Sequence, residues 1–151
     1  MSLKSYVNLM KSAKILSQKW MSCPSELFKI RKSITDACHQ LTYNESDTNA
    51  IVLAIDEACT NIIRYAYKDC RDGEILIEVS ANNRQAIFLL HDYANKVSKD
   101  CIKIKPTSPL IPGGLGVMLM HEVMDSVDFI HTHKCRGNIL EMKKDLPKEN
   151  N

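Results

Sequence analysis

The chain has 151 residues, with 20 Lys and Arg against 18 Asp and Glu, 44% apolar residues and 6% aromatic residues. This composition is typical of a soluble globular protein, and the length suits one domain with one hydrophobic core. The formal charge of +2 comes without a block of like charges, which argues against a direct nucleic acid partner. We expect residues 1–147 to form the domain and residues 148–151 a polar tail.

Membrane insertion and secretion are also disfavoured. The unbroken apolar runs are far shorter than the ~20 residues that a helix needs to cross a bilayer, and residues 1–20 lack the apolar segment of a signal peptide. We therefore expect a cytoplasmic protein without a membrane partner. The six cysteines contain no CxxC pair, which favours reduced thiols. His131, His133 and Cys135 alternate as strand-borne metal ligands would, but no fourth ligand is apparent and solvated sheet faces show the same alternation.

The first half of the chain contains two helical patterns. Apolar residues spaced by three and four predict an amphipathic helix that opens near Pro24 and Ser25; they are Leu27, Ile30, Ile34, Ala37 and Leu41. A second stripe predicts a helix that Ser46 or Asp47 caps and that runs to about Tyr67. This stripe consists of Ile51, Ile55, Ala58 and Ile62.

The second half predicts two β-hairpins separated by a loop and a helix. Its aliphatic segments pair as 74–80 with 85–92, and as 126–133 with 137–144. The long connection over residues 93–112 is typical of a lid or binding loop. After it, a glycine-rich turn opens a third helix that ends near Asp125. A further strand near the start would use three apolar residues that alternate poorly, Ile15, Leu16 and Trp20.

The order of these elements predicts the fold class. Strands paired as hairpins, with helices interspersed, indicate an α+β fold rather than a Rossmann domain. We expect a two-layer sandwich in which a mainly antiparallel mixed sheet is covered by helices on one face.

Two polar residues of the second helix are candidates for chemistry. Glu57 and Asn61 are one turn apart and therefore lie on one flank of the helix, beside its apolar stripe. An amide oxygen is a neutral ligand for Mg²⁺, and a carboxylate can accept a proton or orient a water. A solvated pair on a helix surface has the same spacing, so spacing alone leaves both interpretations open.

Two later features suit nucleotide binding. Asp92 ends an apolar strand, where a carboxylate can accept a hydrogen bond from an exocyclic amine or cap a turn. Immediately before the third helix stand Gly113, Gly114, Leu115 and Gly116. Glycines there let an anion approach the unpaired N–H groups of the helix start, although a plain turn into a helix remains the alternative.

The order of these features resembles the ATP-binding domain shared by gyrase, the Hsp90 chaperones, histidine kinases and MutL. The segments DEACTNIIRYAYKD, GGLGVMLMHEVMDSVDF and GNILEMKKDL look like those of the anti-sigma-factor serine/threonine kinases of bacterial partner-switching systems. This resemblance covers nearly the whole chain, including the early SELFKIRKSI helix. It implies the histidine-kinase-like ATPase fold, also called the Bergerat fold.

The resemblance also implies roles for individual residues. Glu57 would activate the attacking hydroxyl, Asn61 would ligate Mg²⁺, and Asp92 would hydrogen-bond the adenine amino group. The glycine turn would wrap the triphosphate beneath a lid at residues 93–112. The nucleotide-binding positions implied in this way are Asn61, Asp92, Ala94, Gly113, Gly114, Leu115 and Gly116.

One position departs from the family pattern. The family has Asp-x-Gly where this chain has Asp92, Tyr93 and Ala94. A methyl group at the third position would weaken nucleotide binding if that residue takes a positive φ or lies against the adenine. Lys96 could offset the loss by approaching the phosphates, or remain a solvated lysine. The family's His-Ala-Tyr becomes YAY at 65–67, a change that we expect to matter less.

These features together predict an ATP-dependent protein serine/threonine kinase that acts as an anti-sigma factor. The resemblance implies ATP and Mg²⁺ as cofactors, phosphorylation of an anti-sigma-factor antagonist protein, sequestration of a sigma factor, and a homodimer. The alternative is a binding module of the same fold that sequesters a partner without turnover, and Ala94 favours it. The detached catalytic half of a histidine kinase fits less well, because the lid segment lacks that branch's second glycine-rich box.

Overall fold

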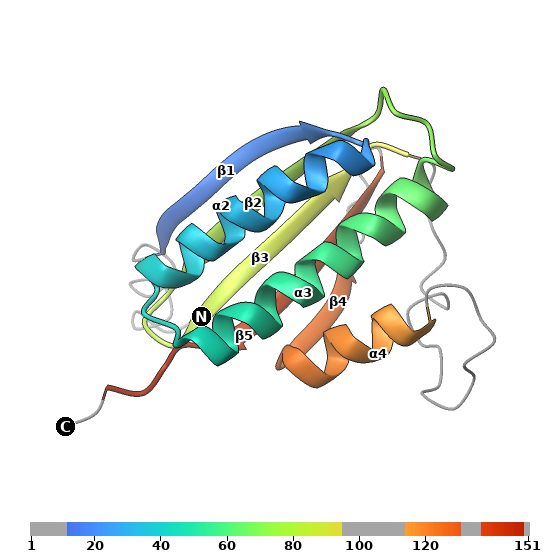
Figure 1. Ribbon diagram of the computed structural model, residues 1–151. Coiled ribbons are helices and arrows are strands. Elements are labelled where there is room, and N and C mark those ends of the chain that lie inside the picture. Colours follow the sequence, from blue (N-terminus) through green and yellow to red (C-terminus); the bar gives the residue numbers. More distant parts are fainter. Residues whose placement is uncertain (1–11, 95–113, 131–136, 150–151) are drawn as a thin grey trace.

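The computed structural model describes residues 12–94, 114–130 and 137–149. Within them, five strands form one sheet in the order β1-β2-β3-β5-β4 (Figure 1). The strands are β1 (Ala13–Met21), β2 (Glu74–Ala81), β3 (Gln85–Asp92), β4 (Ser126–Ile130) and β5 (Asn138–Asp145). All four pairings between described strands are antiparallel, so both predicted hairpins are confirmed. These pairings agree with the predicted, mainly antiparallel sheet, and none of those between described strands is parallel.

Three helices cover one face of the sheet (Figure 1). They are α2 (Leu27–Gln40), α3 (Glu45–Asn61) and α4 (Gly114–Val123). A short 3₁₀ turn, η1 (Pro24–Glu26), leads into α2, and a π-helical turn, η2 (Ile62–Ala66), continues α3. The predicted two-layer α+β sandwich is therefore confirmed. Among the described helices, none has the length and apolar character needed to span a bilayer.

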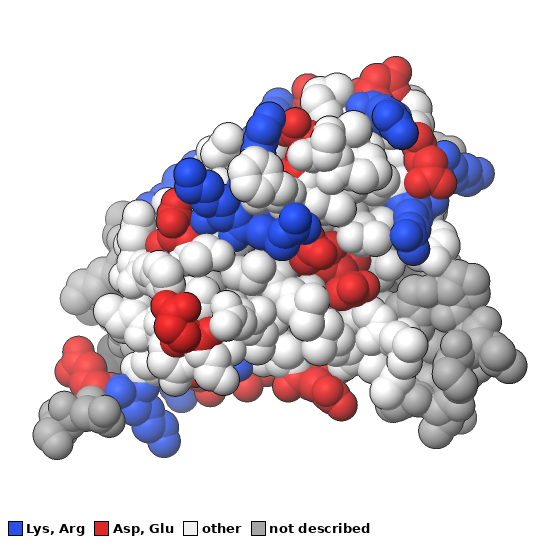
Figure 2. Space-filling model, viewed as in Figure 1, with Lys and Arg blue, Asp and Glu red and all other residues white. Residues whose placement is uncertain are grey.

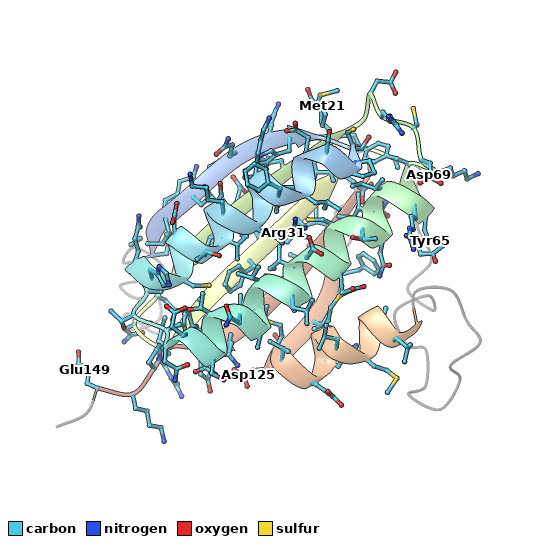
Figure 3. The ribbon with its side chains drawn as sticks, in the orientation of Figure 1. Met21, Arg31, Tyr65, Asp69, Asp125 and Glu149 are labelled. Atoms are coloured by element: carbon cyan, nitrogen blue, oxygen red, sulfur yellow. The ribbon has the colours of Figure 1, made fainter. Side chains whose placement is uncertain are left out.

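The hydrophobic core lies between the two layers. Alternate residues of the central strands are fully buried, as are residues spaced by three or four on the helices, which is the periodicity expected of each element. They include Ile75, Ile77, Val79, Phe88 and Leu90 of the sheet, and Ile30, Ile34, Ile51 and Ile55 of α2 and α3. At the outer surface, Arg31 of α2 pairs with Asp56 of α3 at 2.8 Å; Figure 3 labels Arg31 between these helices.

The structure explains the poor alternation near the start of the chain. β1 is a strand at the edge of the sheet, and its register against β2 shifts between Lys14 and Leu16. A bulge of this kind inserts one extra residue and therefore interrupts the period of two. The predicted strand near the start of the chain is thus confirmed, and the irregular pattern marks the bulge.

The start of α3 differs from the prediction. Asn44 caps the helix, because its side chain accepts a hydrogen bond from the Asp47 N–H at 2.7 Å. The cap expected at Ser46 or Asp47 is therefore wrong by two or three residues. Asn, Ser and Asp cap helices almost equally well, so composition could not separate neighbouring candidates.

The charges on the helical face of the described residues have both signs. Figure 2 shows Lys and Arg side chains interspersed with Asp and Glu over α2 and α3, with uncharged surface between them. This distribution agrees with the nearly balanced charge of the sequence.

Candidate functional site

Glu57 and Asn61 both belong to α3, which Asn61 ends. The core face of this helix is fixed by buried apolar residues, among them Ala54, Ile55 and Ala58. Glu57 and Asn61 are each only partly buried. The pair therefore lies one turn apart beside the buried stripe, as the spacing predicted, and both polar groups have access to solvent or to a ligand.

Although α3 ends at Asn61, the backbone remains helical after it. It continues in the π-helical turn η2, in which the Tyr67 N–H donates to the Ile62 carbonyl five residues earlier at 3.0 Å. Single π-helical turns within helices occur frequently at functional sites. Here the wider turn directly follows Asn61, and no periodicity in the sequence indicated it.

Gly116 brings the start of α4 against Glu57. Gly116 is buried, and a Cβ atom placed on it would lie 2.7 Å from Glu57 Oε2. A side chain at Gly116 would therefore displace the carboxylate, so the glycine permits this close approach. Since the first N–H groups of a helix have no partner within the helix, the contact places Glu57 beside the electropositive end of α4.

Of the remaining glycine-turn positions, the structure describes Gly114 and Leu115 but not Gly113. Gly114 is the first residue of α4 and Leu115 is 66% exposed. Gly113, Lys96 and most of the proposed lid lie outside the described residues, as do His131, His133 and Cys135.

Asp92 is a buried acid at the end of β3. Only 4% of the residue is exposed, and its Oδ1 accepts hydrogen bonds from Asn138 Nδ2 at 2.9 Å and from the Ala94 N–H at 3.1 Å. Burial raises the pKa of the Asp92 carboxyl, and the bonds from Asn138 and Ala94 oppose that rise without cancelling it. A further hydrogen-bond donor, such as one from a ligand, would stabilise the charged form of this buried carboxyl.

Gly137 and Asn138 support Asp92, and the sequence reasoning missed both. Asn138 pairs with Asp92 across the sheet. Gly137 has a φ of +94°, and a Cβ atom there would lie 1.9 Å from the Asp92 carbonyl oxygen. Only glycine lets β5 approach this closely. The Gly-Asn pair at the start of the last strand was the available signal.

The geometry of Ala94 removes one of the two reasons for expecting weak nucleotide binding. Ala94 does not have a positive φ angle. Among the described residues other than glycine, positive φ angles occur at Thr42, Lys68 and Asp69. The alanine therefore adopts an ordinary backbone conformation, and its N–H donates to Asp92.

Tyr67 connects the two halves of the site. It lies six residues beyond Asn61, and its hydroxyl accepts a hydrogen bond from the Tyr93 N–H at 2.8 Å. The structure thus brings together Glu57 with Gly116, and Asp92 with Ala94, and joins the end of the Asn61 segment to the residue after Asp92.

The donor atoms suit magnesium held together with phosphates. Among the described residues, no three or more His, Cys, Asp or Glu side chains gather as a metal site. Mg²⁺ is usually held by one or two protein oxygens, with waters and substrate phosphates completing its shell. The amide of Asn61 and the nearby Glu57 carboxylate offer hard oxygen donors of this type.

The described cysteines behave as the sequence predicted. Cys23, Cys38, Cys59 and Cys70 are free thiols. Burial raises the pKa of the Cys38 thiol to about 12 and raises that of Cys59 as well. These two buried thiols are therefore inert packing residues.

Comparisons with known proteins agree with a site that binds a nucleotide. Residues 22–144 match the family described as the histidine kinase-like ATPase domain. A serine-protein kinase RsbW from Bacillus licheniformis is 26% identical over 148 residues, which cover 92% of this chain and 90% of the relative. The protein of that name from Bacillus cereus is 31% identical over 111 residues, 68% of each chain. The Bacillus subtilis protein of that name is 26% identical over 124 residues, 77% of this chain and 78% of the relative.

Proposed function

The chain belongs to the histidine kinase-like ATPase family, and we propose that it is an ATP-dependent protein serine/threonine kinase that acts as an anti-sigma factor. The observation that carries this proposal is the contact between Gly116 and Glu57, which sets a carboxylate beside the N-terminus of α4. A base and a phosphate-binding helix start are thereby adjacent. The similarity to serine-protein kinases RsbW over most of the chain supports the same activity.

Asp92 is the proposed adenine contact. Its buried carboxylate accepts a hydrogen bond from the exocyclic amino group of adenine, and Asn138 and Ala94 hold the carboxylate in place. A base that lacks a donor at this position would leave the buried acid without the partner that the site offers, so the contact selects adenine.

Asn61 would hold Mg²⁺ through its amide oxygen, and the bound ion would neutralise charge on the phosphates. Glu57 takes the proton of the acceptor hydroxyl. The oxygen of that hydroxyl bonds to the γ-phosphorus while the bond from the γ-phosphorus to ADP breaks. The N–H groups at the start of α4, with Gly114 and Gly116, bind phosphate oxygens. Gly113 and Leu115 complete the proposed nucleotide-binding turn.

The acceptor hydroxyl belongs to a Ser or Thr of an anti-sigma-factor antagonist protein, and a sigma factor is the alternative partner of the same protein. We further propose a homodimer that works in the cytoplasm. The resemblance to the anti-sigma-factor kinases supports these partners, and the balanced charge favours a protein partner over DNA.

The test is transfer of labelled phosphate from ATP to the antagonist by the wild type and by Glu57→Gln. Glu57→Gln keeps the size of the side chain and removes the base, so we expect transfer to fall by about 10²–10⁴-fold. Glu45→Gln, on the exposed first turn of the same helix, is the matched control and should transfer label normally. Equal transfer by Glu57→Gln and the wild type would refute the assignment of Glu57.

A binding module without turnover is the second candidate, and the specific feature that favours it is Ala94 in place of the family's glycine. Calorimetry with ATP and Mg²⁺ separates the two candidates. A kinase should bind nucleotide, whereas the absence of heat and of a thermal shift at millimolar ATP would favour the binding module. At 100 times its Kd a ligand stabilises the folded state by about 2.7 kcal/mol, which a melting experiment detects easily.

A further inference from the structure

We propose that Tyr67 is a positioning residue of the nucleotide site: its hydroxyl fixes the backbone directly after Asp92 and so sets the position of the adenine-binding carboxylate. The inference rests on the proposed function, because it assigns to Tyr67 a part in ATP binding. Its basis is a set of contacts that the resemblance did not indicate, in a segment where we expected sequence changes to matter little.

The Tyr67 hydroxyl makes two hydrogen bonds to the main chain of distant segments. It accepts from the Tyr93 N–H at 2.8 Å and donates to the Glu74 carbonyl at 2.5 Å. An amide N–H can only donate, so the direction of both bonds is fixed. Burial raises the pKa of the Tyr67 phenol, which therefore keeps the proton that it donates to Glu74 at neutral pH.

The Tyr67 ring is held by a close fit to Gly73. A Cβ atom on Gly73 would lie 2.4 Å from a ring carbon of Tyr67. A larger residue at 73 would therefore push the ring away from its place. This close packing and the two hydrogen bonds of the hydroxyl together place it against the Tyr93 N–H.

The main chain around Tyr67 is also tightly determined. The Tyr67 N–H closes the π-helical turn on Ile62, and the Tyr67 carbonyl accepts from the Cys70 N–H at 2.9 Å. The next two residues, Lys68 and Asp69, have φ angles of 51° and 62°. Backbone conformations of this kind persist where surrounding contacts enforce them. Figure 3 labels Tyr65 and Asp69 at this corner of the molecule, on either side of Tyr67 in the sequence.

Asp92 is thus held from two sides. Asn138, the first residue of β5, bonds the Asp92 carboxylate, and Gly137, just before β5, lies against the Asp92 carbonyl. From the end of η2, Tyr67 bonds the next amide, that of Tyr93. The second contact also ties Asp92 to the segment that carries Asn61. Removing the hydroxyl would release one side of the acid while leaving its own hydrogen bonds intact.

The variant that tests this role is Tyr67→Phe, which keeps the ring against Gly73 and removes only the hydroxyl. Tyr43→Phe is the matched control. The Tyr43 hydroxyl also bonds two main-chain carbonyls, those of Lys144 at 3.1 Å and Asp145 at 3.0 Å, and Tyr43 is not part of the proposed site. Tyr67→Phe removes one accepted and one donated hydrogen bond, and Tyr43→Phe removes a proton that is shared between two carbonyls, so both should lower Tm.

The readout is the Kd of ATP, with the KM and kcat of phosphate transfer measured on the same proteins. We expect Tyr67→Phe to raise Kd and KM about three- to tenfold, the equivalent of one lost net hydrogen bond, with kcat nearly unchanged. Tyr43→Phe should leave all three values at those of the wild type. Amide hydrogen exchange should show faster exchange of the Tyr93 N–H in Tyr67→Phe than in the wild type.

The outcomes separate this proposal from the proposed function. If the wild type binds and turns over ATP but Tyr67→Phe binds it as tightly as Tyr43→Phe does, the positioning role is overturned and the kinase assignment stands. If the wild type binds no ATP, the proposed function fails and the role of Tyr67 fails with it. Should Tyr67→Phe not fold, faster exchange at Tyr93 in Gly73→Ala, with weaker ATP binding, would support the role, and unchanged values would overturn it.

Discussion

Asp92→Asn should make the protein more stable while removing ATP binding. The wild-type acid is 4% exposed, and burial raises its pKa, so its charged form is unfavourable in the folded protein at neutral pH. Asparagine keeps an oxygen that can accept from Asn138 Nδ2 and from the Ala94 N–H, and it carries no charge. These two hydrogen bonds, and the one that the Asn138 main-chain N–H donates to the wild-type carboxylate, become weaker with a neutral acceptor, which offsets part of the gain.

We expect a net gain of about 1 kcal/mol, which corresponds to a rise in Tm of about 2–4 °C for a domain of this size. The gain should depend on pH. Because the folded pKa of Asp92 lies above its ordinary value of 3.8, the folded state binds the proton more tightly than the unfolded state. The wild type therefore loses stability as pH rises from the unfolded to the folded pKa, and the loss is complete above the latter. The difference between variant and wild type should be largest at neutral pH and shrink on acidification.

The assay is thermal melting of both proteins at several pH values, with and without ATP and Mg²⁺. Asp36→Asn, an exposed acid of α2, is the control and should change stability by less than about 0.5 kcal/mol. ATP should stabilise the wild type and Asp36→Asn, but not Asp92→Asn. A lower Tm for Asp92→Asn at neutral pH, or a difference from wild type that grows on acidification, would refute the reasoning.

Three further substitutions test other parts of the structure. Gly116→Ala should fold, because the nearest atom to its methyl group would be at the flexible carboxylate end of Glu57. Displacement of that carboxylate should lower kcat by about 10–100-fold with little change in Tm, as kinetics and melting together would show. Gly137→Ala should lose about 2 kcal/mol or more in denaturant titrations, since its Cβ would collide with the Asp92 main chain and the φ of +94° suits glycine; an unchanged midpoint would contradict this geometry. Asn44→Ala should lose about 1 kcal/mol of stability with unchanged ATP affinity, because it removes only the cap of α3.

Sequence periodicity predicted the layers of the fold well. The buried stripes of α2 and α3 and the alternating strands β2 and β3 depend on residues close together in the chain, and these patterns indicate which face is buried. The resemblance then named Glu57, Asn61 and Asp92 as site residues, and the structure sets two of them against specific partners, Gly116 and Asn138.

The parts that could not be predicted depend on contacts between distant residues. The bond from Asn138 to Asp92 spans 46 positions, and the bond from Tyr93 to Tyr67 spans 26. Neither leaves a periodic signal. The β1 bulge adds a residue to an otherwise regular strand, so it appears in the sequence only as a weakened alternation, and the π-helical turn left no periodic signal.

A calorimetric titration of the wild-type protein with ATP and then with GTP, both in Mg²⁺, tests most directly the claim that this chain uses ATP through Asp92. Adenine presents an amino group to the buried acid, whereas guanine presents a carbonyl at the corresponding position and would leave the acid opposed by an acceptor. We predict binding of ATP, with GTP weaker by at least about 100-fold. Equal affinity for the two nucleotides, or binding of neither, would contradict the account.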